Sequence, residues 1–168
     1  TPARLPWLLI GMIGGIGNSM ILGNFDATFA AHPEMALYIP LIGGTGGNVG
    51  TQSSAIIVQG LANSSLDAKN TFKQVTKEAV VALINATIIS LLVYTYNFIR
   101  FGATATVTYS VSISLFAVVM FASIFGTLVP MTLEKLKIDP AIATGPFIAI
   151  TNDIIGMMLY MGITVLLS

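Results

Sequence analysis

Long uncharged runs are the feature that most limits what this chain can fold into. Residues 5–25, 35–66, 79–99 and 101–133 contain no Asp, Glu, Lys or Arg, and these runs are 21, 32, 21 and 33 residues long. Each is long enough to cross the hydrocarbon core of a bilayer, which needs roughly 20 residues as a helix. Charged residues make up 8% of the chain, against about 25% in soluble domains. The chain is therefore predicted to be an all-α integral membrane protein.

These four runs, together with the apolar segment at residues 140–168 that Asp153 interrupts, predict five transmembrane helices in a single membrane domain that takes in residues 1–168. We expect them near residues 6–30, 35–62, 78–99, 108–133 and 140–167. Six of the seven Lys and Arg residues fall on the side of the N-terminus, and Arg100 falls on the other side. The positive-inside rule then places the N-terminus in the cytoplasm and the C-terminus outside the cell membrane. Lysines at positions 69, 73 and 77 predict a short separate helix on the cytoplasmic surface.

The composition argues against several functional classes. The net charge is zero and there is no basic stripe, so no nucleic-acid partner is expected. The chain has no cysteine, which excludes disulfides and thiolate metal sites. It also lacks the Gly-x-Ser-x-Gly and His-Glu-x-x-His motifs and a second intramembrane acid for a catalytic dyad. We therefore expect no enzymatic activity.

The segment at residues 40–52 is rich in glycine. The glycines at four-residue spacing are Gly43 with Gly47 and Gly46 with Gly50. This spacing lets membrane helices pack closely. Asn48 and Gln52, one turn apart, add two amides to one face, and polar groups at that depth face a bundle interior or a wet cavity. Two interpretations stay open here, namely close packing alone, or a pore surface that includes Gly47, Asn48 and Gln52.

Asp153 is an isolated acid inside the last apolar segment. It lies about 13 residues after position 140, or roughly 20 Å along a helix, near the middle of the membrane. An ionised carboxylate there costs about 2.5 to 3.5 kcal/mol, and every Lys and Arg lies in a connection or at a helix end. The carboxyl group is therefore protonated, held by neutral donors such as Asn152 or Asn48, or paired with a cation from solution. Because intramembrane acids usually mark ion pathways, the cation is favoured.

The ligands available near Asp153 are all oxygens. Pro146 is expected to kink the helix and free the carbonyl of Ile142, and Ala149 offers its backbone carbonyl one turn before Asp153. Oxygen ligands without sulfur or imidazole favour hard cations. One carboxylate per chain suits Mg²⁺, which keeps much of its water, better than a Ca²⁺ cage of 6 to 8 ligands. A two-fold homodimer would bring two Asp153 side chains to one divalent ion.

Several sequence blocks spread over the whole chain point to a family. They are Arg4-Leu-Pro-Trp-Leu8, Phe25-Asp26, Ile39-Pro40, Gly46-Gly-Asn-Val-Gly-Thr-Gln52, Lys77-Glu78, Asp139-Pro140, and the run from Gly145-Pro146 through Asp153 and Gly156 to Tyr160. Together they resemble the membrane domain of the MgtE family of magnesium channels and transporters. Asp26 stands where that family usually has glutamate.

The resemblance implies magnesium transport by a homodimer in a lipid bilayer, through a pore lined by the second and fifth helices. Asp153 matches the family's acidic Mg²⁺-recognition residue, and other divalent cations stay open as substrates. The candidates for pore-lining or supporting positions are Gly47, Asn48, Gln52, Gly145 and Asn152. The cytoplasmic N-terminal domain and the CBS modules that family members commonly carry are expected to be absent from these residues.

The alternative function is exchange of Mg²⁺ against Na⁺ or H⁺. Asp153, Asp26 and Glu78 are its candidate ion-binding or titrating groups. The two functions differ in whether a gradient of Na⁺ or H⁺ drives magnesium movement.

Overall fold

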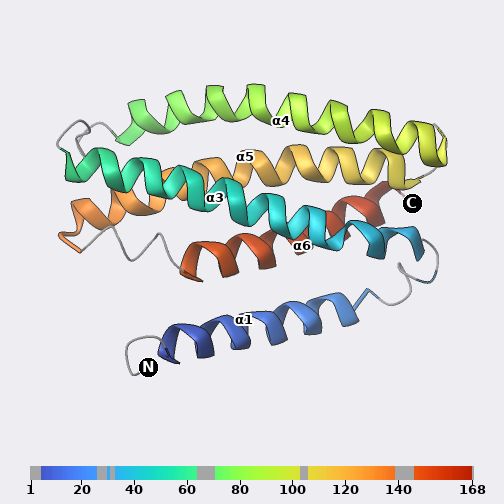
Figure 1. Ribbon diagram of the computed structural model, residues 1–168, viewed down its shortest axis with the longest axis horizontal. Helices are drawn as coiled ribbons and strands as arrows, with labels where there is room; N and C mark the ends of the chain where they lie inside the picture. The colour runs from blue at the N-terminus through green and yellow to red at the C-terminus, as the bar shows by residue number, and fades with distance from the viewer. Residues whose placement is uncertain are drawn as a thin grey trace.

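The computed structural model describes residues 5–25, 30, 33–63, 71–102, 106–138 and 146–167. Its elements in chain order are α1 (Leu5–Gly23), the 3₁₀ helix η1 (Pro33–Tyr38), α3 (Ile39–Ala62), α4 (Thr71–Phe101), α5 (Thr106–Lys135) and α6 (Pro146–Leu167). The helices α3 to α6 run side by side, and α1 lies beside them next to α6 (Figure 1). The predicted all-α class is confirmed within these residues.

Within the described part of the chain, three helical segments are long and apolar enough to cross a membrane, namely Phe72–Phe101, Thr108–Lys135 and Phe147–Leu167. Leu8–Gly23 is a shorter apolar helix. The helix α3 has 24 residues, but its glycine, serine and amide residues make it less apolar than these three. Five membrane crossings therefore stay a prediction.

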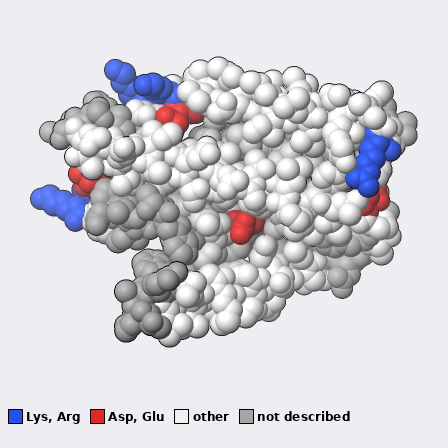
Figure 2. Space-filling view, viewed as in Figure 1, with Lys and Arg blue, Asp and Glu red and all other residues white. Residues whose placement is uncertain are grey.

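Apolar side chains cover the outer surfaces of the bundle. Those exposed on α1 and α4 include Ile13, Met20, Ile84, Leu91 and Leu92, which are 64%, 69%, 57%, 60% and 67% exposed. The visible Lys and Arg side chains instead lie at the two ends of the molecule, with one acidic patch between the ends (Figure 2). An apolar belt between charged ends is the surface that a lipid bilayer requires.

The helix boundaries differ most from the sequence prediction at the end of α1 and the start of α4. The helix α1 ends at Gly23, seven residues before the predicted end. The helix α4 begins at Thr71, seven residues before the predicted start, because residues 71–77 contain no Gly or Pro that would break the helix. The predicted separate surface helix is therefore wrong for these residues, since exposed Lys73 and Lys77 lie on the first turns of α4 itself. Lys69 lies outside the described residues.

Close contacts through glycine hold α3 against α5 and α6. A Cβ atom added to Gly126 of α5 would lie 2.6 Å from the backbone oxygen of Gly50 in α3, and one added to Gly50 would overlap the side chain of Asn152 in α6. The predicted close packing of the glycine-rich helix is thus present in the structure. It places α3 directly beside the part of α6 that carries Asp153.

Buried polar groups join the helices at the end where Arg100 lies. The Tyr38 hydroxyl donates to Asn97 Oδ1, and the hydroxyls of Ser110 and Thr164 share a hydrogen bond. Burial raises the pKa of the Tyr38 hydroxyl above its ordinary value, with a smaller contribution from Tyr96. The hydroxyl therefore keeps its proton and can donate to Asn97, which fixes η1 against α4.

Candidate cation site

Asp153 lies in the first half of α6. It is the eighth residue of the helix that begins at Pro146, or about 10 Å along the axis at roughly 1.5 Å per residue. The helix α6 begins on the side of the bundle where α3 ends and α4 begins. Its first residue lies closer to the centre of the molecule than the ends of α3 and α4 on that side (Figure 1). The depth of Asp153 in the membrane stays a prediction.

The Asp153 carboxylate rests against the backbone of α3 and is only partly buried. A Cβ atom on Gly43 would lie 3.1 Å from Asp153 Oδ1 and 3.8 Å from Met157 Cε. Asp153 forms no hydrogen bond and no ion pair with any other described residue. The chain thus brings an acid to the contact between α3 and α6 and, among these residues, supplies nothing to neutralise it.

Asn152, the neighbour of Asp153, is 1% exposed. Neither Oδ1 nor Nδ2 of this amide has a hydrogen-bond partner in the described part of the chain. The side chain packs against Gly50 and therefore lies between α3 and α6. It does not donate to Asp153, so the structure lacks the neutral support that the sequence allowed from Asn152.

The other predicted donor, Asn48, lies on a different surface. Asn48 and Gln52 are exposed on α3, and a Cβ atom on Gly47 would meet nothing within 4 Å. Asn48 makes no side-chain hydrogen bond to the described residues. Gly47 and these two amides form one polar strip on the outside of a single chain.

The backbone around Asp153 is regular. The helix α6 is continuous from Pro146 to Leu167, so the carbonyl of Ala149 accepts the N–H of Asp153 and keeps one free lone pair. Pro146 is the first residue of this described helix, where a missing N–H costs little, so the expected kink does not occur between residues 146 and 167. Gly145, Ile142 and Asp26 lie outside the described residues.

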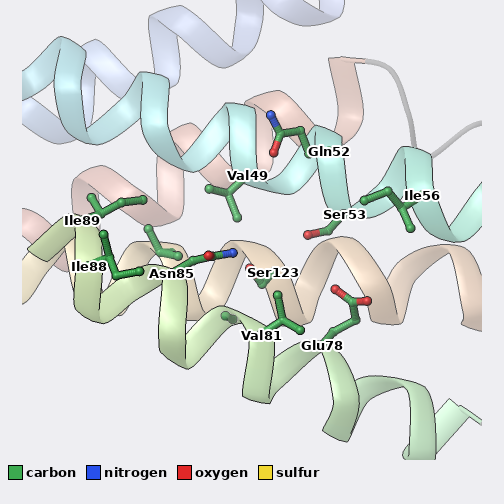
Figure 3. A pocket seen from close by; sticks show the side chains of 12 residues that line it. Val49, Gln52, Ser53, Ile56, Glu78, Val81, Asn85, Ile88, Ile89 and Ser123 are labelled. Carbon is green, nitrogen blue, oxygen red and sulfur yellow. The ribbon is translucent and has the colours of Figure 1, made fainter.

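Glu78 lies in a different place, on the wall of a cavity between α3, α4 and α5. The cavity has a volume of about 320 Å³, and Gln52 also lines it (Figure 3). Three further polar residues of the wall, which the sequence prediction missed, are Ser53, Asn85 and Ser123. Asn85 follows Glu78 by seven residues, a helical spacing that could have indicated their common face.

The described residues contain no group of three or more His, Cys, Asp or Glu side chains that could hold a metal ion. Among the described residues, a cation at Asp153 or at Glu78 would therefore not find a cage of three or more such ligands. Such an ion must keep its water or take ligands from a second chain.

Residues 39–163 match the MgtE family, described as a divalent cation transporter. The chain belongs to the MgtE family. The matched region begins with α3 and ends within α6, so it includes Gly43, Glu78 and Asp153. The resemblance predicted from the sequence is confirmed, and the MgtE family is one of transporters and not of enzymes. With its long apolar helices, the chain is an integral membrane protein.

Three relatives are each named magnesium transporter MgtE. The protein of Bacillus subtilis is 32% identical over 160 residues, which are 95% of this chain and 35% of that protein. The protein of Thermus thermophilus is 32% identical over 165 residues, 98% of this chain and 36% of the relative. The protein of Enterococcus faecalis is 28% identical over 160 residues, 95% of this chain and 35% of the relative. The chain thus spans about a third of the length of these MgtE relatives.

Proposed function

We propose that this domain carries Mg²⁺ across the cell membrane through a pore between two copies of the chain. In this proposal α3 and α6 line the pore and Asp153 recognises the ion. The observation that supports it most directly is the Asp153 carboxylate, which lies against Gly43 with no partner among the described residues. The names of the three relatives support magnesium as the ion.

The chemistry of the site favours recognition of a hydrated ion. Mg²⁺ gives up its water reluctantly and is usually held by one or two carboxylates. Each chain offers one carboxylate at Asp153, and the remaining lone pair of the Ala149 carbonyl is the nearest backbone acceptor one turn away. Two chains related by a two-fold axis would offer two negative charges, which balance one divalent cation.

The polar strip on α3 supports pairing of two chains. In a single chain, Asn48 and Gln52 would face lipid, which cannot satisfy their hydrogen bonds. Open space beside Gly44 and Gly47 leaves room for another helix or for water. A second copy that packs around a wet pore meets both requirements.

The direction of the chain in the membrane follows from its lysines. Lys73 and Lys77 at the start of α4 lie at the same end of the bundle as Lys135 and Lys137 at the close of α5. We infer that this end is cytoplasmic, by the positive-inside rule. The N-terminus is then cytoplasmic and the C-terminus outside, with five crossings.

The substitution Asp153→Asn tests the proposal. It keeps the shape of the side chain and removes its charge, so Mg²⁺ flux into proteoliposomes should fall at least tenfold, which corresponds to about 1.4 kcal/mol or more. Cross-linking should still capture a dimer. Glu134→Gln, an exposed acid at the lysine end of α5, is the matched control and should transport normally. Full and equally selective flux through Asp153→Asn would overturn the proposal.

A second candidate function is exchange of Mg²⁺ against Na⁺ or H⁺. The observation in its favour is a second acid, Glu78, on a cavity wall that carries no Lys or Arg. Exchange predicts that a Na⁺ or pH gradient imposed on the same liposomes drives Mg²⁺ uphill. A channel predicts that Mg²⁺ only follows its own electrochemical gradient.

A further inference from the structure

The cavity between α3, α4 and α5 lies apart from Asp153, although Gln52 of the polar strip on α3 is also part of its lining. It is lined by twelve side chains, and neither Asp153 nor Gly43 is among them. Figure 3 shows the cavity between α3 and α4, with α5 behind, and the Glu78, Ser53 and Asn85 side chains extending into the space between the helices. Its volume of about 320 Å³ has room for roughly ten water molecules at about 30 Å³ each.

Polar side chains from all three helices meet at this cavity. The helix α3 contributes Gln52 and Ser53, α4 contributes Glu78 and Asn85, and α5 contributes Ser123. Within the described residues, the one hydrogen bond recorded for these side chains is from Gln74 Nε2 to Glu78 Oε1, at 3.3 Å.

None of these five side chains has a fully enclosed polar atom without a partner. Ser53 and Ser123 are buried, Glu78 is partly buried, and Gln52 and Asn85 are exposed. Polar groups at membrane depth that do not bond to one another require water or an ion.

The charge of the cavity decides which ion fits. Glu78 is the one ionisable side chain in the lining, which contains no Lys, Arg or His. A divalent ion would leave one uncompensated positive charge in a partly apolar space, which is costly. A monovalent ion is balanced by Glu78, and the Asn85 amide and the hydroxyls of Ser53 and Ser123 supply neutral oxygen ligands of the kind that hard cations prefer.

We propose that this cavity binds one monovalent cation, with Na⁺ as the fitting ion, through the Glu78 carboxylate and side-chain oxygens of α3, α4 and α5. Glu78 lies six residues after Phe72, or roughly 9 Å along α4 at about 1.5 Å per residue. The ion would therefore enter from the lysine end of the bundle. Each chain would hold its own Na⁺ ion, whether or not two chains form a pore.

Equilibrium binding of ²²Na⁺ to the purified protein in lipid nanodiscs, with Mg²⁺ removed by chelator, tests this assignment. We expect saturable binding of about one Na⁺ per chain and at least a tenfold loss of affinity in Glu78→Gln. Ser123→Ala removes one neutral ligand at a different helix and should weaken binding severalfold, which covers the case in which Glu78→Gln fails to fold. Asp153→Asn and Glu134→Gln should bind Na⁺ normally.

Several results would overturn the assignment. One is that the unmodified protein shows no saturable Na⁺ binding. The others are that Glu78→Gln and Ser123→Ala both bind Na⁺ as tightly as the unmodified protein, and that Asp153→Asn loses Na⁺ binding. If Mg²⁺ displaces ²²Na⁺ at a lower concentration than unlabelled Na⁺ does, the assignment to a monovalent cation is contradicted. If the unmodified protein binds no Na⁺ but carries a co-purified phospholipid that Glu78→Gln lacks, the cavity is a lipid site instead. Because binding is measured without flux, a failure of the proposed magnesium pore would leave these results unchanged.

Discussion

Gly126 is the position where the fold should tolerate a side chain least. A Cβ atom there would lie 2.6 Å from the Gly50 oxygen and 3.2 Å from Ser53 Cβ, and ordinary contact begins at 3.4 Å. The first neighbour is backbone, so no rotamer change relieves it, and α3 and α5 must separate by about 0.8 Å. Overpacking of this kind costs about 1 to 3 kcal/mol. This cost is partly offset because Ala stabilises a helix by about 1 kcal/mol relative to Gly.

Gly15→Ala isolates the packing cost, because Gly15 lies within α1 and a Cβ atom there meets nothing within 4 Å. Both variants gain the same helix propensity, so Gly126→Ala should be less stable than Gly15→Ala by about 1 to 3 kcal/mol. The midpoint of thermal unfolding in detergent should then be lower by roughly 2 to 12 °C, at about 2 to 4 °C per kcal/mol. Equal midpoints for the two variants would refute the close contact of α3 with α5.

Two further substitutions test buried polar groups. Asn152→Leu removes an amide whose two polar atoms have no partner in the described residues. The relief of about 1 to 3 kcal/mol should raise the unfolding midpoint, and a lower midpoint would contradict this effect. Tyr38→Phe removes the hydrogen bond to Asn97 and should lower the unfolding midpoint by the equivalent of about 1 to 3 kcal/mol. The control is Tyr96→Phe at an exposed position, which should change stability by less than about 0.5 kcal/mol. Equal midpoints for the two variants would show that the buried hydrogen bond adds nothing to stability.

The sequence predicted the helical class and the close packing of the glycine-rich helix because both follow from strong local signals. Uncharged runs of membrane length have few other folds available, and glycines four residues apart indicate close helix contacts. Boundaries were predicted less well. The start of α4 at Thr71 could not be predicted from the charges, because Lys73 and Lys77 suggested a separate surface helix. In the structure they lie on the first two turns of α4.

Asn152 shows what local sequence cannot reveal. It is adjacent to Asp153, which suggested that its amide would support the carboxylate. Consecutive residues on a helix point about 100° apart, and here that rotation sends Asn152 against Gly50 and leaves Asp153 beside Gly43. The roles of the two side chains depend on where α3 crosses α6, which is a property of the packed bundle.

The two acids without basic partners illustrate the same limit at a larger scale. Asp153 could be recognised from the sequence because it interrupts an apolar run alone, and a solitary charge at that depth requires a partner. Glu78 follows Lys77 and precedes a long apolar run, so on sequence alone it resembles an ordinary acid at a helix start. Its distinctive environment comes from α3 and α5, which bring Ser53, Gln52 and Ser123 to the same cavity. Only the packing of three helices turns this terminal acid into a candidate cation ligand, and Na⁺ binding by Glu78→Gln therefore tests that packing together with the chemistry.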